Sequence, residues 1–180
     1  LEWMQKNNID TSYIRTIDDS YTAQAYITTD QNANQITTFH PGAMQFSNQI
    51  DIPNDQSINL GLISPDGREG MLTHTKQLIE MNIPYIFDPG QGMPMFNKDE
   101  LKFFSDNSMW IVMNDYEFKM YNEITGLSVK DLVETHKTII ITNGEKGSKI
   151  FSPEQELNIP TPNVNEPKDP TGCGDAYRAG

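Results

Sequence analysis

The chain has 180 residues, with 13 lysines and arginines against 25 aspartates and glutamates, which gives a formal net charge of −12 at pH 7. This acidic balance argues against a nucleic-acid-binding surface, and the lack of any apolar run near the ~20 residues of a membrane span argues against membrane insertion. The single cysteine, Cys173, rules out an internal disulfide framework and a cysteine-based zinc site, and it is typical of a reducing, cytoplasmic location.

The first part of the chain predicts the end of a helix, over residues 1–8, followed by exposed antiparallel strands. From about Ile9 to Met44 the sequence is rich in Thr, Tyr, Ile and Gln. Alternating stretches such as Tyr21–Thr28 suit strands that have one face in water. Asp30–Asn34 is the expected turn between two of these strands.

From Asn59 onward, short apolar runs alternate with amphipathic segments, which is the pattern of strands alternating with helices. The expected strands are Leu60–Ser64, Pro84–Asp88, Met109–Met113 and Thr138–Thr142. The expected helices are Gly67–Met81, Lys98–Phe104, Tyr116–Thr125 and Ser128–His136. This alternation predicts an α/β fold with a mostly parallel sheet that is covered on both faces.

In such sheets, ligands bind at the carboxyl ends of the strands. The residues predicted to lie at those ends are Asp88, Asn114, Thr142 and Gly144. Residues three apart share a face of a first helical turn, so Asn114 and Glu117 can point together toward this edge. The alternative is a capping box, in which Asn114 caps the helix and Glu117 bonds back to its amide; the two interpretations are compatible.

The strand Thr138–Thr142 opens into a turn bracketed by Gly144 and Gly147, and a second strand follows. On these residues alone the segment is a plain β-hairpin.

The segment Asp169–Gly180 places a carboxylate directly after a Gly-x-Gly turn. Gly172 and Gly174 lack a β-carbon, so the amides of Gly172, Cys173 and Gly174 can turn toward an anion, and a following helix adds positive potential. A carboxylate there would repel a static phosphate, but it suits Asp175 to orient and deprotonate an alcohol that attacks one. The pattern predicts phosphoryl transfer to a hydroxyl; the alternative is an ordinary loop with Asp175 as a helix N-cap.

These segments resemble the ribokinase-like (PfkB) carbohydrate kinase family, whose second signature is Asp-Thr-x-Gly-Ala-Gly-Asp followed by a helix of small residues. Here Pro170 replaces the usual Thr and Cys173 the usual Ala, and both are compatible with the turn. Asn114–Glu117 matches the family's Asn-x-x-Glu, and Thr142–Gly147 its Thr-x-Gly-x-x-Gly, in the family's order.

The resemblance implies a ribokinase-like three-layer αβα sandwich with a small antiparallel β lid, and ATP-dependent phosphorylation of a primary hydroxyl with Mg²⁺. Asp175 would be the general base, and the amides of Gly172, Cys173 and Gly174 would form the anion hole. The nucleotide would be bound by Thr142, Gly144 and Gly147. Its Mg²⁺ would be held, through water, by Asn114 and Glu117.

The resemblance also implies a division of the chain. Residues 9–44 would form the lid, and residues 45–180 the α/β kinase core, truncated at both ends relative to the family. The chain corresponds to the middle portion of such kinases, so we expect this fragment to be inactive by itself.

Asn34–Met44, Phe87–Pro94 and Cys173 are similar to the corresponding segments of bacterial adenosine kinases of this family, which implies adenosine as the acceptor. A purine needs an aromatic face and an amide, which Phe39 and Gln91 offer. The alternatives are a core strand residue for Phe39 and a turn residue for Gln91.

Other functions stay open at this stage. The acceptor could be another nucleoside, ribose or fructose, and the protein could be a non-catalytic nucleotide-binding regulator. Exposed lid strands could also pair between subunits in a homodimer.

Overall fold

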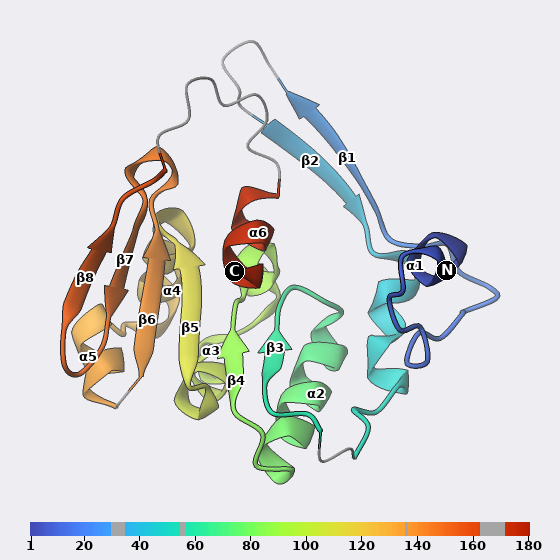
Figure 1. Cartoon of the computed structure of the whole chain (residues 1–180), viewed down its shortest axis with the longest axis horizontal. Helices are drawn as coiled ribbons and strands as arrows, with labels where there is room; N and C mark the ends of the chain where they lie inside the picture. Colours follow the sequence, from blue (N-terminus) through green and yellow to red (C-terminus); the bar gives the residue numbers. More distant parts are fainter. Residues whose placement is uncertain (30–34, 55–56, 136, 163–171) are drawn as a thin grey trace. The chain divides into compact units, whose positions relative to one another are not determined.

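The computed structural model (Figure 1) describes residues 1–29, 35–54, 57–135, 137–162 and 172–180. The expected turn at Asp30–Asn34 therefore lies outside the described residues, as do His136 and the Asp169–Thr171 part of the C-terminal motif. Contacts divide the chain into two compact units. One is formed by Leu1–Asn59 and Pro65–Ile83, and the other by Leu60–Ser64 and Pro84–Gly180.

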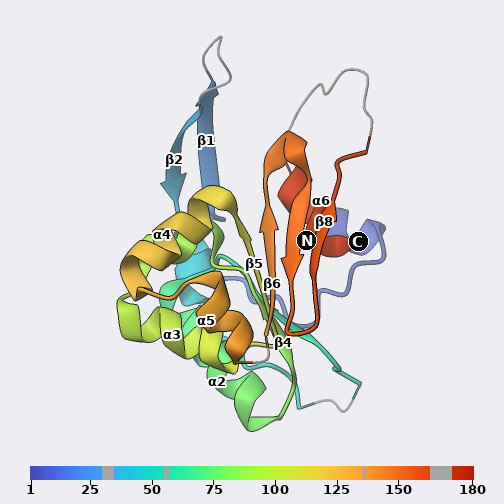
Figure 2. The same ribbon diagram turned by 90° about the vertical axis from the view of Figure 1, so that its left-hand side faces the viewer.

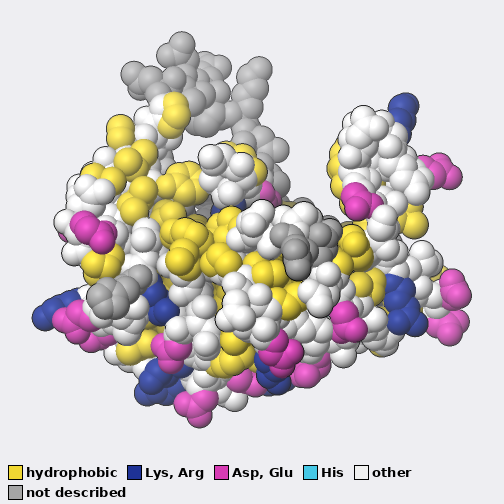
Figure 3. Space-filling view, turned by 60° about the horizontal axis from the view of Figure 1, so that its bottom comes forward, with side chains coloured by type: hydrophobic (Ala, Val, Ile, Leu, Met, Phe, Trp, Pro, Cys, Tyr) yellow, Lys and Arg dark blue, Asp and Glu magenta, His cyan; other side chains and the backbone are white. Residues whose placement is uncertain are grey.

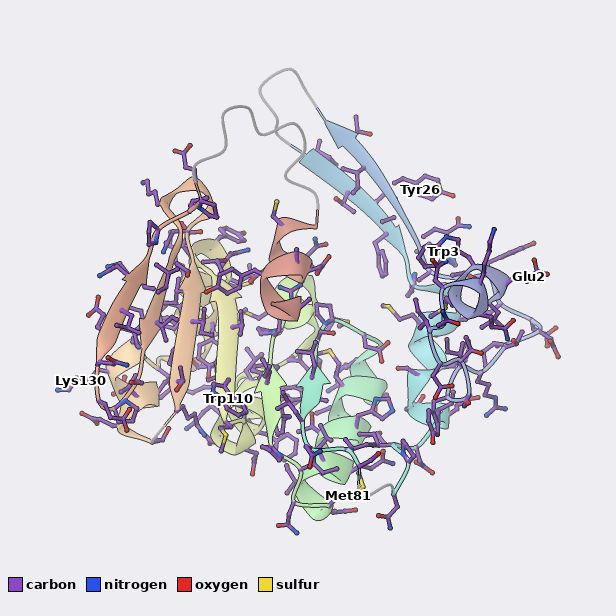
Figure 4. All side chains as sticks on the ribbon, in the orientation of Figure 1. Glu2, Trp3, Tyr26, Met81, Trp110 and Lys130 are labelled. Atoms are coloured by element: carbon purple, nitrogen blue, oxygen red, sulfur yellow. The ribbon has the colours of Figure 1, made fainter. Side chains whose placement is uncertain are left out.

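The first unit holds a small antiparallel sheet, two α-helices and a 3₁₀ segment. Its elements are α1 Glu2–Lys6, β1 Gln24–Thr29, β2 Gln35–His40, η1 Gly42–Gln49 and α2 Arg68–Glu80. β1 and β2 pair in the antiparallel sense, with Ala25 opposite Phe39 and Tyr26 opposite Thr38. Tyr26 projects outward from β1 and is 62% exposed (Figure 4). The predicted exposed antiparallel strands are confirmed at these two elements.

The prediction of strands is wrong for the residues between Ile9 and β1, which form turns and extended stretches. The carboxylate of Asp10 accepts hydrogen bonds from the backbone amide and the hydroxyl of Ser12, at 2.9 and 2.6 Å. Short polar side chains that bond to the nearby backbone in this way compete with a strand ladder.

The helix α2 packs against η1 through a close approach at Gly70. A β-carbon built on Gly70 would lie 1.9 Å from the hydroxyl oxygen of Ser47, so a larger residue at this position would require the Ser47 side chain to move. One turn further on, Nε2 of His74 lies 2.9 Å from the carbonyl oxygen of Ile50. The predicted helix near Gly67–Met81 is confirmed.

The second unit is built on a six-stranded sheet whose strand order follows the chain, β3-β4-β5-β6-β7-β8. The strands are β3 Gly61–Ile63, β4 Tyr85–Phe87, β5 Trp110–Asn114, β6 Thr138–Thr142, β7 Ser148–Phe151 and β8 Glu156–Ile159. β3, β4, β5 and β6 pair with one another in the parallel sense, whereas β7 is antiparallel to both β6 and β8.

All four predicted parallel strands are confirmed, with ends that differ by at most one residue. The sequence did not indicate β8, because all four of its residues are exposed at the edge of the sheet. Its place is set by backbone pairing with β7 rather than by burial of an apolar face.

Helices lie on both faces of this sheet (Figure 2). They are α3 Lys98–Asn107, α4 Asp115–Thr125 and α5 Val129–Glu134 on one face and α6 Cys173–Ala179 on the other, while the 3₁₀ segment η2 Gly90–Met95 follows β4. The expected three-layer α/β arrangement with a mostly parallel sheet is confirmed.

The core lies between the sheet and the helices α3 and α4. The rings of Phe87 and Phe104 are stacked with centroids 4.9 Å apart, and the hydroxyl of Tyr85 donates to the carbonyl oxygen of Phe104 at 2.6 Å. Ile111 and Ile139, in neighbouring strands, are completely buried. This packing fixes the level at which the strands end.

The helices α3, α4 and α5 each begin with a complete capping box. The residue pairs are Asn97 with Glu100, Asn114 with Glu117, and Ser128 with Asp131. Because each box satisfies two otherwise unpaired amides, the local sequence fixes where each helix starts.

The surface drawn in Figure 3 carries Lys and Arg side chains scattered among Asp and Glu side chains. In the described part of the chain, helices long and apolar enough to traverse a bilayer do not occur.

Candidate active site

The carboxyl ends of β4, β5 and β6 bring three predicted residues to one edge of the sheet. Asp88 directly follows β4, and Asn114 and Thr142 are the last residues of β5 and β6. Asn114 and Thr142 are register partners, so they lie side by side. The three residues therefore share one edge of the sheet within the second unit.

At the end of β5, Asn114 and Glu117 form the capping box of α4. Oδ1 of Asn114 accepts from the amide of Glu117 at 2.7 Å, and Oε2 of Glu117 accepts from the amide of Asn114 at 2.8 Å. The capping interpretation is thus confirmed. Oε1 of Glu117 is not used by the box, so this oxygen can still serve a ligand at the edge.

The donor set of the second unit fits a water-mediated magnesium site better than a directly coordinated one. Among the described residues, no group of three or more His, Cys, Asp or Glu side chains could hold a metal ion. Mg²⁺ gives up its hydration shell reluctantly and is often bound through one or two carboxylates and substrate phosphates. Glu117 and Asn114 offer one free carboxylate oxygen and one amide, which is compatible with that mode.

The turn after β6 is shaped by two glycines with positive φ. Gly147 has φ +84°, and a β-carbon there would lie 2.0 Å from the carbonyl oxygen of Ile159 in β8. A hydroxyl from Thr161 donates to the carbonyl oxygen of Glu145 at 2.7 Å and holds the turn from outside. The hairpin predicted from Thr142, Gly144 and Gly147 is therefore present, with Gly147 required by its close contact with β8.

The C-terminal motif forms the start of α6. Gly172, in the left-handed conformation with φ +79°, is the N-cap, and the first backbone bond of the helix runs from the Ala176 amide to the Gly172 carbonyl oxygen at 2.9 Å. The amides of Gly172, Cys173 and Gly174 precede the helical ladder, as an anion-binding turn requires.

Asp175 is the third residue of α6, and its side chain is 80% exposed. The alternative that Asp175 is the N-cap is wrong, because Gly172 occupies that position and no side chain caps the helix. The carboxylate thus projects from the first turn, next to the three amides, and is accessible to a reactant.

Arg178 joins Asp175 to a buried carboxylate. It forms an ion pair with Oδ1 of Asp175, and its Nε lies 2.7 Å from Oδ2 of Asp88, whose side chain is only 1% exposed. Burial raises the pKa of Asp88 to about 6; Arg178 opposes the rise, whereas the carboxylates of Glu117 and Asp175 add to it. Arg178 therefore links two carboxylates at this edge, those of Asp88 and Asp175.

The sequence analysis did not single out Arg178. A signal was available, because Asp175 and Arg178 are three residues apart in a predicted helix and so share a face. Its pairing with Asp88 could not have been found in this way, since that contact depends on α6 folding back over the sheet.

The two proposed purine contacts lie in different units. Gln91 is exposed on η2 in the second unit. Phe39 is 50% exposed on β2 in the first unit, so it is not a core residue there. Met93 and Phe96, which follow Gln91 closely in the sequence, are buried, with 0% and 5% of their surface exposed.

Solved structures share this architecture. The nucleoside kinase of Burkholderia thailandensis in complex with inosine matches with a TM-score of 0.94 and 40% identity, over 98% of this chain and 58% of that chain. A ribokinase from Thermotoga maritima matches with a TM-score of 0.74 and 22% identity, over 98% of this chain and 59% of that one. The chain thus has the ribokinase-like fold.

The chain belongs to the pfkB family of carbohydrate kinases, whose pattern matches residues 1–180. Among curated relatives, the nucleoside kinase of Methanocaldococcus jannaschii is 30% identical over 178 residues, covering 99% of this chain and 58% of the relative. That of Thermoplasma acidophilum is 30% identical over 181 residues, covering 100% and 57%. The chain therefore spans less than two thirds of the length of these relatives.

Proposed function

We propose that the whole protein is a nucleoside kinase that transfers the γ-phosphoryl group of ATP to a primary hydroxyl. The observation that carries this proposal is the exposed carboxylate of Asp175 on the first turn of α6, next to the amides of Gly172, Cys173 and Gly174. Structures of the Burkholderia thailandensis enzyme with inosine and with ADP-inosine support the choice of substrates.

In the proposed reaction, Asp175 accepts the proton of the acceptor hydroxyl. The hydroxyl oxygen then forms a bond to the γ-phosphorus while the bond between that phosphorus and the bridging oxygen breaks, which releases ADP. The three amides at the start of α6 stabilise negative charge on the migrating group. Removal of one such donor typically costs ~10²–10³ in rate.

Nucleotide binding is assigned to the turn after β6 and to the start of α4. Thr142, Gly144 and Gly147 would lie along the phosphates and ribose of ATP. Asn114 and Glu117 would hold the hydration shell of Mg²⁺, which supplies positive charge to the phosphate oxygens when bound.

The acceptor is proposed to be a purine nucleoside, with its 5′-hydroxyl as the reacting group. Adenosine is the first candidate and inosine the second, because the Burkholderia thailandensis relative has been solved with inosine. Phe39 would stack on the base and Gln91 would pair with its edge.

The two-stranded sheet within residues 9–44 is proposed to be a lid over the core formed by residues 45–180. A lid would exclude water, which otherwise competes with the acceptor for the phosphoryl group. We also propose that the exposed lid strands pair between two subunits in a homodimer. The proposed location of the protein is the cytoplasm.

The test is ATP-dependent phosphorylation by the full-length protein with Mg²⁺, measured as ADP release with adenosine, inosine, ribose and fructose. We expect turnover with a nucleoside, and a loss of about 10²–10⁴-fold in Asp175→Asn, with ATP binding by calorimetry nearly unchanged. Undiminished turnover in Asp175→Asn would refute the assignment of the base. Turnover with sugars alone would remove Phe39 and Gln91 from the acceptor site.

A further inference from the structure

Arg178 occupies a bridging position between two carboxylates of different character. Asp88 is buried directly after β4, whereas Asp175 is exposed on α6, and the guanidinium group of Arg178, itself 23% exposed, contacts both. A guanidinium group presents several donors in a fixed plane, so one arginine can hold two carboxylates in a fixed relation.

The anchor of this bridge is rigid. The amide of Asp88 donates to the carbonyl oxygen of Ile63 in the neighbouring strand β3 at 2.9 Å, so the backbone that carries the buried carboxylate belongs to the sheet. Within the described residues, Oδ2 of Asp88 has no hydrogen-bond partner, although Nε of Arg178 is close to it. The contact is therefore an ion pair, and Arg178 compensates a charge that burial would otherwise make costly.

A second contact fixes α6 on the side of β7. The hydroxyl of Tyr177 lies 2.8 Å from the hydroxyl oxygen of Ser148, which is buried at the start of β7. Consecutive residues of α6 thus reach two different strand ends, Arg178 toward β4 and Tyr177 toward β7. The helix that carries Asp175 is held against rotation.

We propose that Arg178 is a positioning residue for Asp175, anchored by Asp88. The pair occupies Oδ1 of Asp175, so Oδ2 is the oxygen left to receive the proton of the acceptor hydroxyl. This inference rests on the proposed function, in which Asp175 is the general base. A displacement of about 1 Å at a reacting group can cost ~10²-fold in rate, so the bridge would act on turnover rather than on substrate affinity.

The test compares Arg178→Gln, Arg178→Lys and Asp88→Asn in the full-length protein, with Lys130→Gln as the control. Lys130 also forms an ion pair, with Glu134 at 3.7 Å, but it is exposed on α5, away from α6 (Figure 4). For each variant, kcat and the KM for nucleoside and ATP are measured, together with the circular dichroism spectrum and the melting temperature.

We expect Arg178→Gln to lower kcat about 10–100-fold with KM values within about twofold of the wild type. Arg178→Lys should restore part of the loss, because a single ammonium group can hold one carboxylate but lacks the planar fork. Asp88→Asn should lower kcat less, and it should add little in the Arg178→Gln background, because both changes break the same bridge. Lys130→Gln should behave like the wild type.

A normal kcat in a folded Arg178→Gln variant would overturn the inference. A rise in the KM for ATP alone would also overturn it, since it would assign Arg178 to the phosphates. Asp175→Asn separates this inference from the proposed function. If the wild type is active and Asp175→Asn is not, failure of the Arg178 variants to respond counts only against the bridge; an inactive wild type counts against the function itself.

Discussion

At the scale of single residues, Asp88 is a carboxyl group whose pKa is strongly changed by its surroundings. Its pKa rises from 3.8 to about 6, mainly through burial. Between these values the folded protein binds a proton that the unfolded chain releases, so stability falls as the pH rises through this window. Below about pH 4 the Asp88 carboxyl group is protonated in both the folded and the unfolded state, so this loss of stability is absent. Above about pH 6 the loss of stability is complete.

Asp88→Asn should therefore gain stability relative to the wild type as the pH rises from 4 to 7. The expected change in the difference between their free energies of unfolding is on the order of 3 kcal/mol, from 1.36 kcal/mol per pKa unit. Urea unfolding at both pH values measures it, with Glu123→Gln, an exposed position on α4, as the control. A difference that does not vary with pH would mean that Asp88 is not raised in the folded state.

At the scale of elements, the same motif, the capping box, begins three helices, so its structural role can be compared with the functional role that we propose for one of them. Asn97 on α3 and Asn114 on α4 make the same pair of hydrogen bonds, but only Asn114 lies beside Thr142 at the proposed nucleotide site. The two asparagines are thus a matched pair for testing the magnesium assignment.

Asn97→Ala and Asn114→Ala should each lower the free energy of unfolding by about 1 kcal/mol, since each removes an N-cap. Only Asn114→Ala should also raise the Mg²⁺ concentration needed for half-maximal turnover. Chemical denaturation and a magnesium titration of the full-length protein give the two quantities. Equal magnesium dependence in both variants would leave Asn114 with a capping role alone.

The parts of the fold that the sequence predicted depend on short-range patterns. The pattern that predicts a strand lies within the run Thr138–Thr142 itself. The start of α4 was predicted from Asn114 and Glu117, which are only three residues apart. β8 and the Asp88–Arg178 pair depend on tertiary partners that are distant in sequence. The stretch before β1 was predicted wrongly because the prediction relied on the alternation of polar and apolar residues. It did not take into account the local turn that Asp10 stabilises.

At the scale of the whole molecule, the two units differ in how much of their backbone is protected. Tyr26 and Ile36 of the small sheet are 62% and 76% exposed, whereas Ile111 and Ile139 of the large sheet are completely buried. Local opening should therefore cost less free energy in the small sheet.

In hydrogen exchange, amides of β1 and β2 should exchange much faster than those of β5 and β6. Adding nucleoside and an ATP analogue to the full-length protein should slow exchange in β1 and β2 if they form a lid. Mass spectrometry of peptic fragments measures both. Unchanged exchange in β1 and β2 with saturating ligands would contradict the lid.

The strand order of the large sheet has a consequence for synthesis on the ribosome. Because β3 to β8 pair in the order in which they are made, each new strand meets a partner that has already left the exit tunnel. Among the described strands of this sheet, each one from β4 onward pairs with the strand made just before it, which shortens the time that its apolar side chains stay exposed. The sheet can therefore grow by addition at one edge, in step with translation.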